Sequence, residues 1–229
     1  MIVERSAAAI VQLTVFNEGI REACFRYLPL PEGETLTFDT PLGPLAVSCA
    51  SRAVLPMQVE ARRLVISSPW PPGADAGAPG PAHEVTHFLF TGWPDFGVPE
   101  DPAALRALSR AVREVAPADE RAAPIVVHCS AGIGRSGTFV GFDAEACRAR
   151  HALAQGGPRV PSTSASRGSA TSKGGDRFNL PALVRRMREQ RDGMVQGAAQ
   201  YAYLRSCLQE ELAELEGDGG GVAQGGGPG

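Results

Sequence analysis

A cysteine and an arginine separated by five residues form the part of this chain best suited to chemistry. Glycines inside such a loop free the backbone to curl around an anion, and inward-pointing N–H groups create a concavity that binds oxyanions. An arginine adds a planar fork that can hold two phosphoryl oxygens at once. The spacing of Cys129 and Arg135 therefore predicts a phosphate-binding loop with a cysteine nucleophile at its floor. The five residues between them are Ser130, Ala131, Gly132, Ile133 and Gly134.

The elements on either side of the loop favour the ionised form of the cysteine. Val126 and Val127 read as the end of a buried strand, and a helix is predicted from Ser136 onward. The N-terminus of that helix faces the loop, and thiols in such electropositive niches have pKa values of roughly 3.5–7.5. We therefore expect Cys129 to be a thiolate at neutral pH. The alternative is a small buried cysteine in a strand–helix turn, with a surface arginine nearby.

A second segment offers an acid. Displacing an alkoxide or phenoxide from phosphorus needs a proton donor near the leaving oxygen, and Asp95 is the candidate. Trp93 and Phe96 can bury and release apolar surface, while Gly92 and Gly97 permit hinge dihedral angles. The stretch is thus predicted to be a lid that closes on substrate. The alternative is an ordinary Pro–Asp turn with an aromatic anchor.

Three segments, in this order along the chain, resemble the protein tyrosine phosphatase family. Residues 91–99 are similar to the mobile acid loop of that family. Residues 128–138 resemble its signature loop, which reads His-Cys, five residues, Arg, then Ser or Thr. Residues 188–196, with Gln200 and Tyr201, are similar to its glutamine-bearing loop. The resemblance implies an α/β fold, with a twisted mixed sheet flanked by helices and the signature loop at a strand's C-terminal end.

The same resemblance implies hydrolysis of phosphotyrosine in proteins through a cysteinyl-phosphate intermediate, without metal or cofactor. Cys129 would attack phosphorus while Arg135 and the loop amides hold the oxygens, and Asp95 would protonate the leaving phenol. Gln196 would orient the water that releases phosphate, and Gln200 would support it from the same helix face. The alternative for both glutamines is an exposed helix surface.

Supporting roles follow for four further residues. Ser136 could donate a hydrogen bond to the sulfur or simply cap the following helix. His128 precedes the nucleophile, Trp93 anchors the acid loop, and Glu18 matches a glutamate that orients the signature arginine or is a solvated turn carboxylate. Ala23 replaces a lysine that the family usually carries, so weaker closure of the acid loop is expected.

Composition excludes several other classes of protein. The chain has 229 residues, 43% of them apolar, and a net charge of −3 with no basic stripe, so no nucleic-acid partner is expected. No apolar run of 18 residues predicts a membrane span, and the first residues lack a signal-peptide layout. Five cysteines without paired or metal-like spacing indicate a reducing compartment, so a cytoplasmic location is expected. Oligomeric state cannot be inferred.

Hydrophobic patterns place the regular elements. Strands are predicted at 9–14, 45–49, 57–67 and 84–90, with a Pro/Gly connection at 68–82. Asp101 and Pro102 open a helix whose apolar stripe comprises Leu105, Leu108, Val112 and Val115. Further helices are predicted from 136 to about 150, at 180–190 and at 196–215, the last with an inner stripe of Leu204, Cys207, Leu208 and Leu212.

The domain prediction is one catalytic region with two flexible parts. Residues 155–176 are rich in Ser, Gly and Pro and are expected to be a disordered insertion, and 217–229 a glycine-rich tail. The resemblance begins near Ala9. A full domain of the family would by that point already have passed its first helices, several strands and its phosphotyrosine-recognition loop. Residues 1–216 are therefore expected to be the C-terminal two thirds of a catalytic domain. Such a fragment is expected to expose apolar surface where the other elements would pack.

Two alternative functions remain at this stage. A catalytically impaired phosphotyrosine-binding scaffold would keep Arg135 and the loop but lack lid closure or a deep pocket, and Ala23 favours it. A phosphatase for dual-specificity or lipid substrates would need a shallower or more basic loop, whereas Ala131, Ile133 and the acid-loop composition resemble the tyrosine-specific branch.

Overall fold

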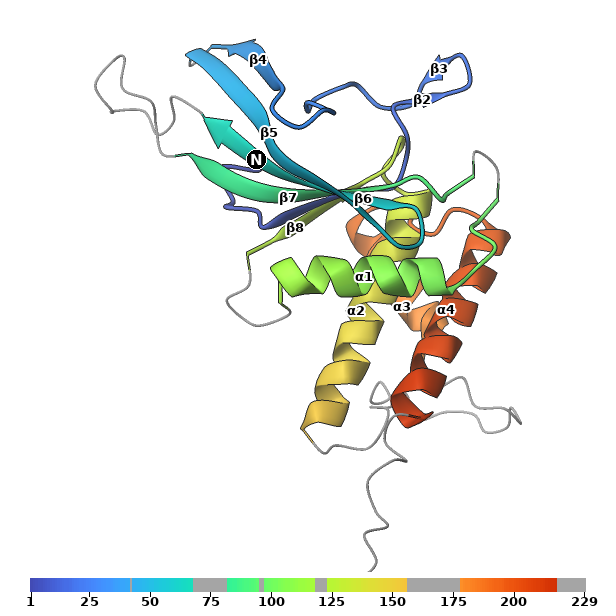
Figure 1. Cartoon of the computed structure of the whole chain (residues 1–229). Helices are drawn as coiled ribbons and strands as arrows, with labels where there is room; N and C mark the ends of the chain where they lie inside the picture. Colours follow the sequence, from blue (N-terminus) through green and yellow to red (C-terminus); the bar gives the residue numbers. More distant parts are fainter. Residues whose placement is uncertain (42, 68–81, 95–96, 118–122, 156–177, 218–229) are drawn as a thin grey trace, which may run out of the picture.

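The structure is a computed structural model that describes residues 1–41, 43–67, 82–94, 97–117, 123–155 and 178–217 (Figure 1). Its centre is a six-stranded sheet with the order β4-β5-β6-β7-β1-β8. The strands are β1 (Ala9–Gln12), β4 (Thr35–Thr40), β5 (Gly43–Leu55), β6 (Val59–Ser67), β7 (His83–Phe90) and β8 (Ile125–His128). A separate two-stranded hairpin is formed by β2 (Asn17–Glu18) and β3 (Arg21–Glu22).

The sheet is mixed, as the resemblance implies. Strands β4 to β7 pair antiparallel, whereas β1 lies parallel to both β7 and β8. Parallel strands end at the same edge of a sheet, so the segments after β1, β7 and β8 meet there. These segments lead into Glu18, Trp93 and Cys129, which places the predicted acid loop, the signature loop and Glu18 at one edge.

Four helices cover one face of this sheet, as Figure 1 shows. They are α1 (Ala103–Val115), α2 (Gly134–Ala154), α3 (Leu180–Gln190) and α4 (Ala198–Gly217). Leu105, Phe142 and Leu204, from three of these helices, are fully buried in one cluster with Val11 of β1. Ile10, the residue of β1 before Val11, belongs to a second cluster on the opposite face. The alternation of side chains along a strand therefore divides the core into two parts.

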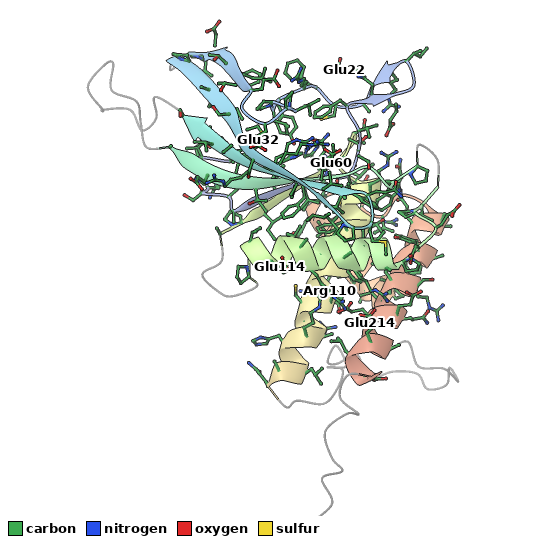
Figure 2. The ribbon with its side chains drawn as sticks, in the orientation of Figure 1. Glu22, Glu32, Glu60, Arg110, Glu114 and Glu214 are labelled. Atoms are coloured by element: carbon green, nitrogen blue, oxygen red, sulfur yellow. The ribbon has the colours of Figure 1, made fainter. Side chains whose placement is uncertain are left out.

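Ion pairs tie the helices to one another. Arg106 of α1 contacts Glu210 of α4 at 3.0 Å, and Arg150 of α2 contacts Glu211 of α4 at 2.7 Å. Figure 2 shows Arg110 of α1 and Glu214 of α4 on facing helices, where they form another pair. Glu211 is fully buried, and its ion pairs with Arg150 and Arg110 offset the cost of removing its carboxylate from water.

The face of the sheet opposite the helices contains an apolar hollow of about 750 Å³. Its floor is formed by side chains of the second cluster, among them Val47, Leu64 and Ile66. Tyr27 and His128 also line it, so this hollow reaches the end of the strand that carries the nucleophile.

Several predicted boundaries differ from the structure. The strand predicted at 45–49 extends over Gly43–Leu55, and the helix after the loop runs from Gly134 to Ala154 rather than from 136 to 150. The last helix begins at Ala198, not at 196. Strand β8 was expected to be buried but is half-buried along its length. Within the described residues it pairs only with β1, so it forms an edge of the sheet.

The predicted helix stripes are largely confirmed. Leu204, Cys207, Leu208 and Leu212 of α4 are all buried. In α1 the buried stripe continues from Val112 to Ala116, one turn further, so Val115 is 43% exposed and the prediction for it is wrong. The N-cap of α1 is Pro102, so Asp101 lies one residue before the predicted cap position, although its carboxylate accepts a hydrogen bond from the backbone N–H of Ala103 at 2.8 Å.

Candidate active site

The predicted phosphate-binding loop joins β8 to α2. Cys129 directly follows the last residue of the strand and is 8% exposed. The backbone N–H of Gly132 donates to its Sγ at 3.2 Å, so one loop amide already faces the sulfur. Gly132 has a φ of +71°, a left-handed conformation that glycine adopts without strain. The local geometry is that of a loop curled around the position above the thiol.

Arg135 lies in the first turn of α2, and its guanidinium connects three segments. Nη1 donates to Oε1 of Glu18 at 2.5 Å and to the backbone oxygen of Leu13 at 3.3 Å. Nη2 donates to the backbone oxygen of Pro94 at 3.2 Å. The arginine fork is thereby held in place before any substrate arrives, which reduces the entropy lost on binding an oxyanion.

Glu18 is placed for the orienting role that the resemblance implies. Its Oε1 also accepts a hydrogen bond from the hydroxyl of Thr14 at 2.9 Å. Burial raises the pKa of Glu18, but the hydrogen bonds from Arg135 and Thr14 and the charge of Arg135 outweigh it and hold that pKa below its ordinary value. The carboxyl group is therefore ionised at neutral pH, as a partner of arginine requires.

The acid loop is described only at its two ends. Trp93 is 5% exposed and donates from Nε1 to the backbone oxygen of Gly97 at 3.2 Å. Its ring packs edge to face against Phe90 and Tyr203, with centroid distances of 6.4 and 6.0 Å. Trp93 thus anchors the loop to the core. Asp95, the candidate acid, lies outside the described residues.

The glutamine-bearing segment packs directly against the signature loop. The backbone N–H of Gln196 donates to Oε1 of Gln200 at 2.9 Å. A Cβ atom on Gly134 would lie 2.7 Å from the amide nitrogen of Gln200 and 3.3 Å from Oε1 of Gln196. Both predicted glutamines therefore lie beside the loop, and the glycine makes this approach possible.

Ser136 is 3% exposed and points into the protein. Its Oγ has no hydrogen-bond partner among the described residues, so donation to the sulfur of Cys129 stays a prediction. The alternative role as a helix cap is wrong. Ser136 is the third residue of α2, which begins at Gly134, and the cap position belongs to Ile133.

Three contacts of the loop were not predicted from the sequence. Arg21 of β3 donates to the Ser130 hydroxyl at 2.9 Å, and Arg191 donates to the backbone oxygen of Ala131 at 3.2 Å. Nε2 of His128 lies 2.7 Å from the Tyr27 hydroxyl. Arg191 belongs to the segment that resembles the glutamine-bearing loop, so the resemblance could have indicated that this arginine lies near the signature loop. The other two pairs are far apart along the chain and become neighbours only through the sheet.

The fold and this site together have the form of a cysteine-based phosphate-binding domain. Cys129, the candidate nucleophile, stands at a strand–helix junction, a loop amide faces its sulfur, and Arg135 beside it is held by the carboxylate of Glu18. Such a combination suits a covalent displacement at phosphorus.

The chain belongs to the protein-tyrosine phosphatase family, whose model matches residues 1–210. It is 33% identical over 210 residues to human receptor-type tyrosine-protein phosphatase C, covering 92% of this chain and 13% of that protein. It is 31% identical over 210 residues to human receptor-type tyrosine-protein phosphatase epsilon, covering 92% of this chain and 25% of that protein.

Solved structures agree with this assignment. A protein tyrosine phosphatase of Trypanosoma cruzi superposes with a TM-score of 0.68 at 28% identity, covering 93% of this chain and 63% of the other. One from Trypanosoma brucei gives 0.66 at 30% identity, covering 93% and 62%. The chain thus spans under two thirds of these structures and a smaller share of the receptor-type relatives. Within the described residues, no helix is long and apolar enough to cross a membrane.

Proposed function

We propose that this chain hydrolyses phosphotyrosine in proteins by a double displacement through a cysteinyl-phosphate intermediate. The observation that carries the proposal is the geometry of the loop. The sulfur of Cys129 accepts a hydrogen bond from Gly132, and the guanidinium of Arg135 is held by Glu18 at 2.5 Å. These groups form a preorganised site for a phosphate dianion beside a nucleophile.

In the first displacement, the thiolate of Cys129 attacks phosphorus and the bond to the tyrosine oxygen breaks. Loop amides and Arg135 bind the nonbridging oxygens, most strongly as negative charge spreads over them in the transition state. Asp95 gives its proton to the departing phenolate oxygen. The products of this step are the dephosphorylated tyrosine residue of the substrate protein, a carboxylate at Asp95 and phosphate covalently bound to sulfur.

In the second displacement, water attacks the phosphorus of the intermediate. Gln196 orients this water, Gln200 supports Gln196, and the carboxylate of Asp95 accepts the proton. The sulfur–phosphorus bond breaks and the thiolate is restored. A hydrogen bond from Ser136 to the sulfur would make it a better leaving group.

Rates with a small aryl phosphate and with a phosphotyrosyl peptide test this proposal. Cys129→Ser should abolish turnover, and Asp95→Ala should reduce kcat by roughly 10²–10⁴-fold, the usual contribution of a general acid. Phosphoseryl peptide is the control substrate and should be hydrolysed far more slowly. Absence of wild-type turnover together with retained phosphotyrosyl-peptide binding would favour the scaffold function. Ala23, in place of the usual lysine, is the sequence feature that supports this alternative.

We further propose that the protein works in a reducing compartment, with a cytoplasmic catalytic region. All five cysteines are unpaired, and a cysteine nucleophile must stay reduced in order to react.

A further inference from the structure

The β2–β3 hairpin contacts the signature loop at two separate points. Glu18 and Arg21 are paired residues of its two strands, so their side chains lie on the same face. The carboxylate of Glu18 accepts a hydrogen bond from Nη1 of Arg135 at 2.5 Å. Nη2 of Arg21 donates to the hydroxyl of Ser130, the residue after Cys129, at 2.9 Å. One cross-strand pair of opposite charge thus contacts the loop both just after its cysteine and at its arginine.

The hairpin is too short to hold its own position. Each strand has two residues, and an isolated hairpin is at best marginally stable in water. Ile20 in its turn is fully exposed, and Figure 1 shows the hairpin projecting away from the six-stranded sheet. The tip is therefore not held by apolar packing, and polar contacts with the loop must position it.

The first strand of the hairpin is anchored more firmly than the second. Glu18 contacts Arg135 and the hydroxyl of Thr14, and the side chains of Glu18 and Arg135 are each only 12% exposed. Both residues of the second strand are exposed, and the hydrogen bond from Arg21 to Ser130 joins this strand to the loop. Arg21 is also the only cationic residue from position 17 to 24, so no neighbour on the hairpin can replace its contact.

Arg21 also acts on Glu18 through its charge. Burial raises the pKa of Glu18, whereas the hydrogen bonds from Arg135 and Thr14 and the charge of Arg135 lower it, and the charge of Arg21 adds to the lowering. The guanidinium of Arg21 therefore lies close enough to stabilise the carboxylate that holds Arg135.

We propose that Arg21 is a positioning residue, whose hydrogen bond to Ser130 holds the hairpin on the signature loop and thereby keeps Glu18 against Arg135. The proposal rests on the proposed function, because the geometry that it maintains is that of the phosphate-binding fork. Without this bond the hairpin moves more freely, and Arg135 samples orientations other than the one that Glu18 fixes. Binding an oxyanion then costs the entropy of ordering the fork again.

Tungstate binding tests this role without relying on turnover. A tetrahedral oxyanion needs the loop and the fork of Arg135, but no general acid and no attacking water. In isothermal titration, Arg21→Ala should bind tungstate roughly three- to tenfold more weakly than the wild-type chain, as expected for losing one charge-assisted hydrogen bond at an exposed position. Arg21→Lys keeps the charge and a donor, and should recover most of the affinity.

Arg63→Ala is the matched control. Arg63 forms an exposed ion pair with Glu84 between β6 and β7, at 3.4 Å, and the variant should bind tungstate like the wild-type chain. Equal weakening in Arg63→Ala and Arg21→Ala would show that any lost positive charge has this effect, and would overturn the proposal. Unchanged binding in Arg21→Ala would overturn it as well.

A double-mutant cycle shows whether Arg21 acts through Ser130. Ser130→Ala removes the acceptor of the hydrogen bond and should weaken tungstate binding in the same direction. The combined variant should bind about as weakly as Arg21→Ala alone, because residues that act through one contact are not additive. Fully additive losses would mean that Arg21 and Ser130 act independently, which contradicts the positioning role.

Steady-state kinetics separate positioning from direct recognition of a substrate peptide. A loosened fork should lower kcat/KM by a similar factor for a small aryl phosphate and for a phosphotyrosyl peptide, because both present the same phosphate to Arg135. A loss confined to the KM of the peptide would make Arg21 a peptide contact and overturn the proposal. A wild-type chain that binds tungstate without turnover contradicts the proposed function alone, and the tungstate comparison then still decides the role of Arg21. A wild-type chain that binds no tungstate contradicts both.

Discussion

The contacts of a single guanidinium explain why the signature loop needs arginine. Arg135 donates from Nη1 to Glu18 and Leu13 and from Nη2 to Pro94, so its plane is fixed by partners on two sides. A lysine ammonium is a point charge on a flexible stem and cannot reproduce this fork. Arg135 thus holds the start of the acid loop against the core, and the proposed function adds the binding of phosphate oxygens to this role.

Arg135→Lys should reduce kcat/KM for an aryl phosphate by roughly 10²–10³-fold, the scale expected when a preorganised donor to transition-state charge is lost. Steady-state kinetics at neutral pH provide the measurement. Arg26→Lys is the matched control, because Arg26 pairs with Glu34 at 2.6 Å on the surface. A comparable loss in the control, or no loss in Arg135→Lys, would contradict the role of the fork.

At this scale, local sequence predicts only part of the site. Cys129 and Arg135 stand in one short segment, so their types and spacing suffice to infer a phosphate-binding loop. Glu18 lies 117 positions from Arg135, and only the resemblance to a family could pair them. Tyr27 offers no such signal, because its contact with His128 depends on which elements become neighbours in the fold.

The contact between α2 and the segment before α4 determines where the glutamines lie. A Cβ atom on Gly137 would be 2.5 Å from the backbone nitrogen of Val195, closer than real Cβ atoms approach. That segment is also held by Arg188, which donates to the backbone oxygens of Met194 and Val195 at 2.9 and 2.8 Å. Helix and segment thus meet with no space for a side chain.

Gly137→Ala should therefore displace the segment that carries Gln196 and lower the free energy of unfolding by about 1–3 kcal/mol, as overpacking does. The step that hydrolyses the intermediate should slow, so a rapid-mixing experiment should show a burst of phenol release followed by a slower steady state. Gly217→Ala is the control, since a Cβ there meets nothing within 4 Å. Unchanged stability and no burst in Gly137→Ala would contradict the close contact.

Helices with a regular repeat of apolar residues could be predicted from the sequence. Strands whose extent depends on pairing with a neighbouring strand could not. The predicted helix at 180–190 coincides with α3, whose Asn179 side chain accepts a hydrogen bond from Ala182 at its start. Strand β4, by contrast, is half-exposed along its length, and its register is set by β5. The extra length of β5 likewise follows from pairing with β6, because residues beyond Cys49 are mostly exposed.

At the scale of the whole molecule, the two faces of the sheet differ. Helices cover one face, and the other contains the hollow of about 750 Å³ with apolar walls. Accessible apolar surface of this kind binds environment-sensitive dyes such as anilinonaphthalene sulfonate. The folded chain of 229 residues should therefore increase the fluorescence of this dye before any thermal transition begins.

A charge placed in the hollow should reduce that signal. Leu45→Glu introduces a carboxylate at a half-buried position of its lining, and the dye fluorescence should fall severalfold. Val54→Glu is the control on the same strand, because Val54 is 71% exposed and lies outside the hollow. Equal signals from the two variants would show that the dye binds elsewhere.

The loss of folding stability at low pH should depend in part on the buried imidazole ring of His87. Burial first, and then the charges of Arg62 and His128, lower the pKa of His87 to about 3, whereas an unfolded histidine titrates near 6.5. Below pH 6.5 the unfolded chain therefore binds a proton that the folded chain does not, and stability falls as pH drops toward 3. Between pH 7 and pH 5 this single group should remove about 2 kcal/mol of unfolding free energy.

Urea unfolding of the wild-type chain and of His87→Leu at both pH values isolates this effect. The variant loses the hydrogen bond to Gln12, so it can be less stable at pH 7, but its own loss between pH 7 and pH 5 should be smaller by about 2 kcal/mol. Carboxylates whose pKa is held low by arginine, such as Glu18 and Glu60, are the same in both proteins and cancel in the comparison. Equal losses in the two proteins would mean that the ring is protonated in the folded state, which would contradict the low pKa that burial gives His87.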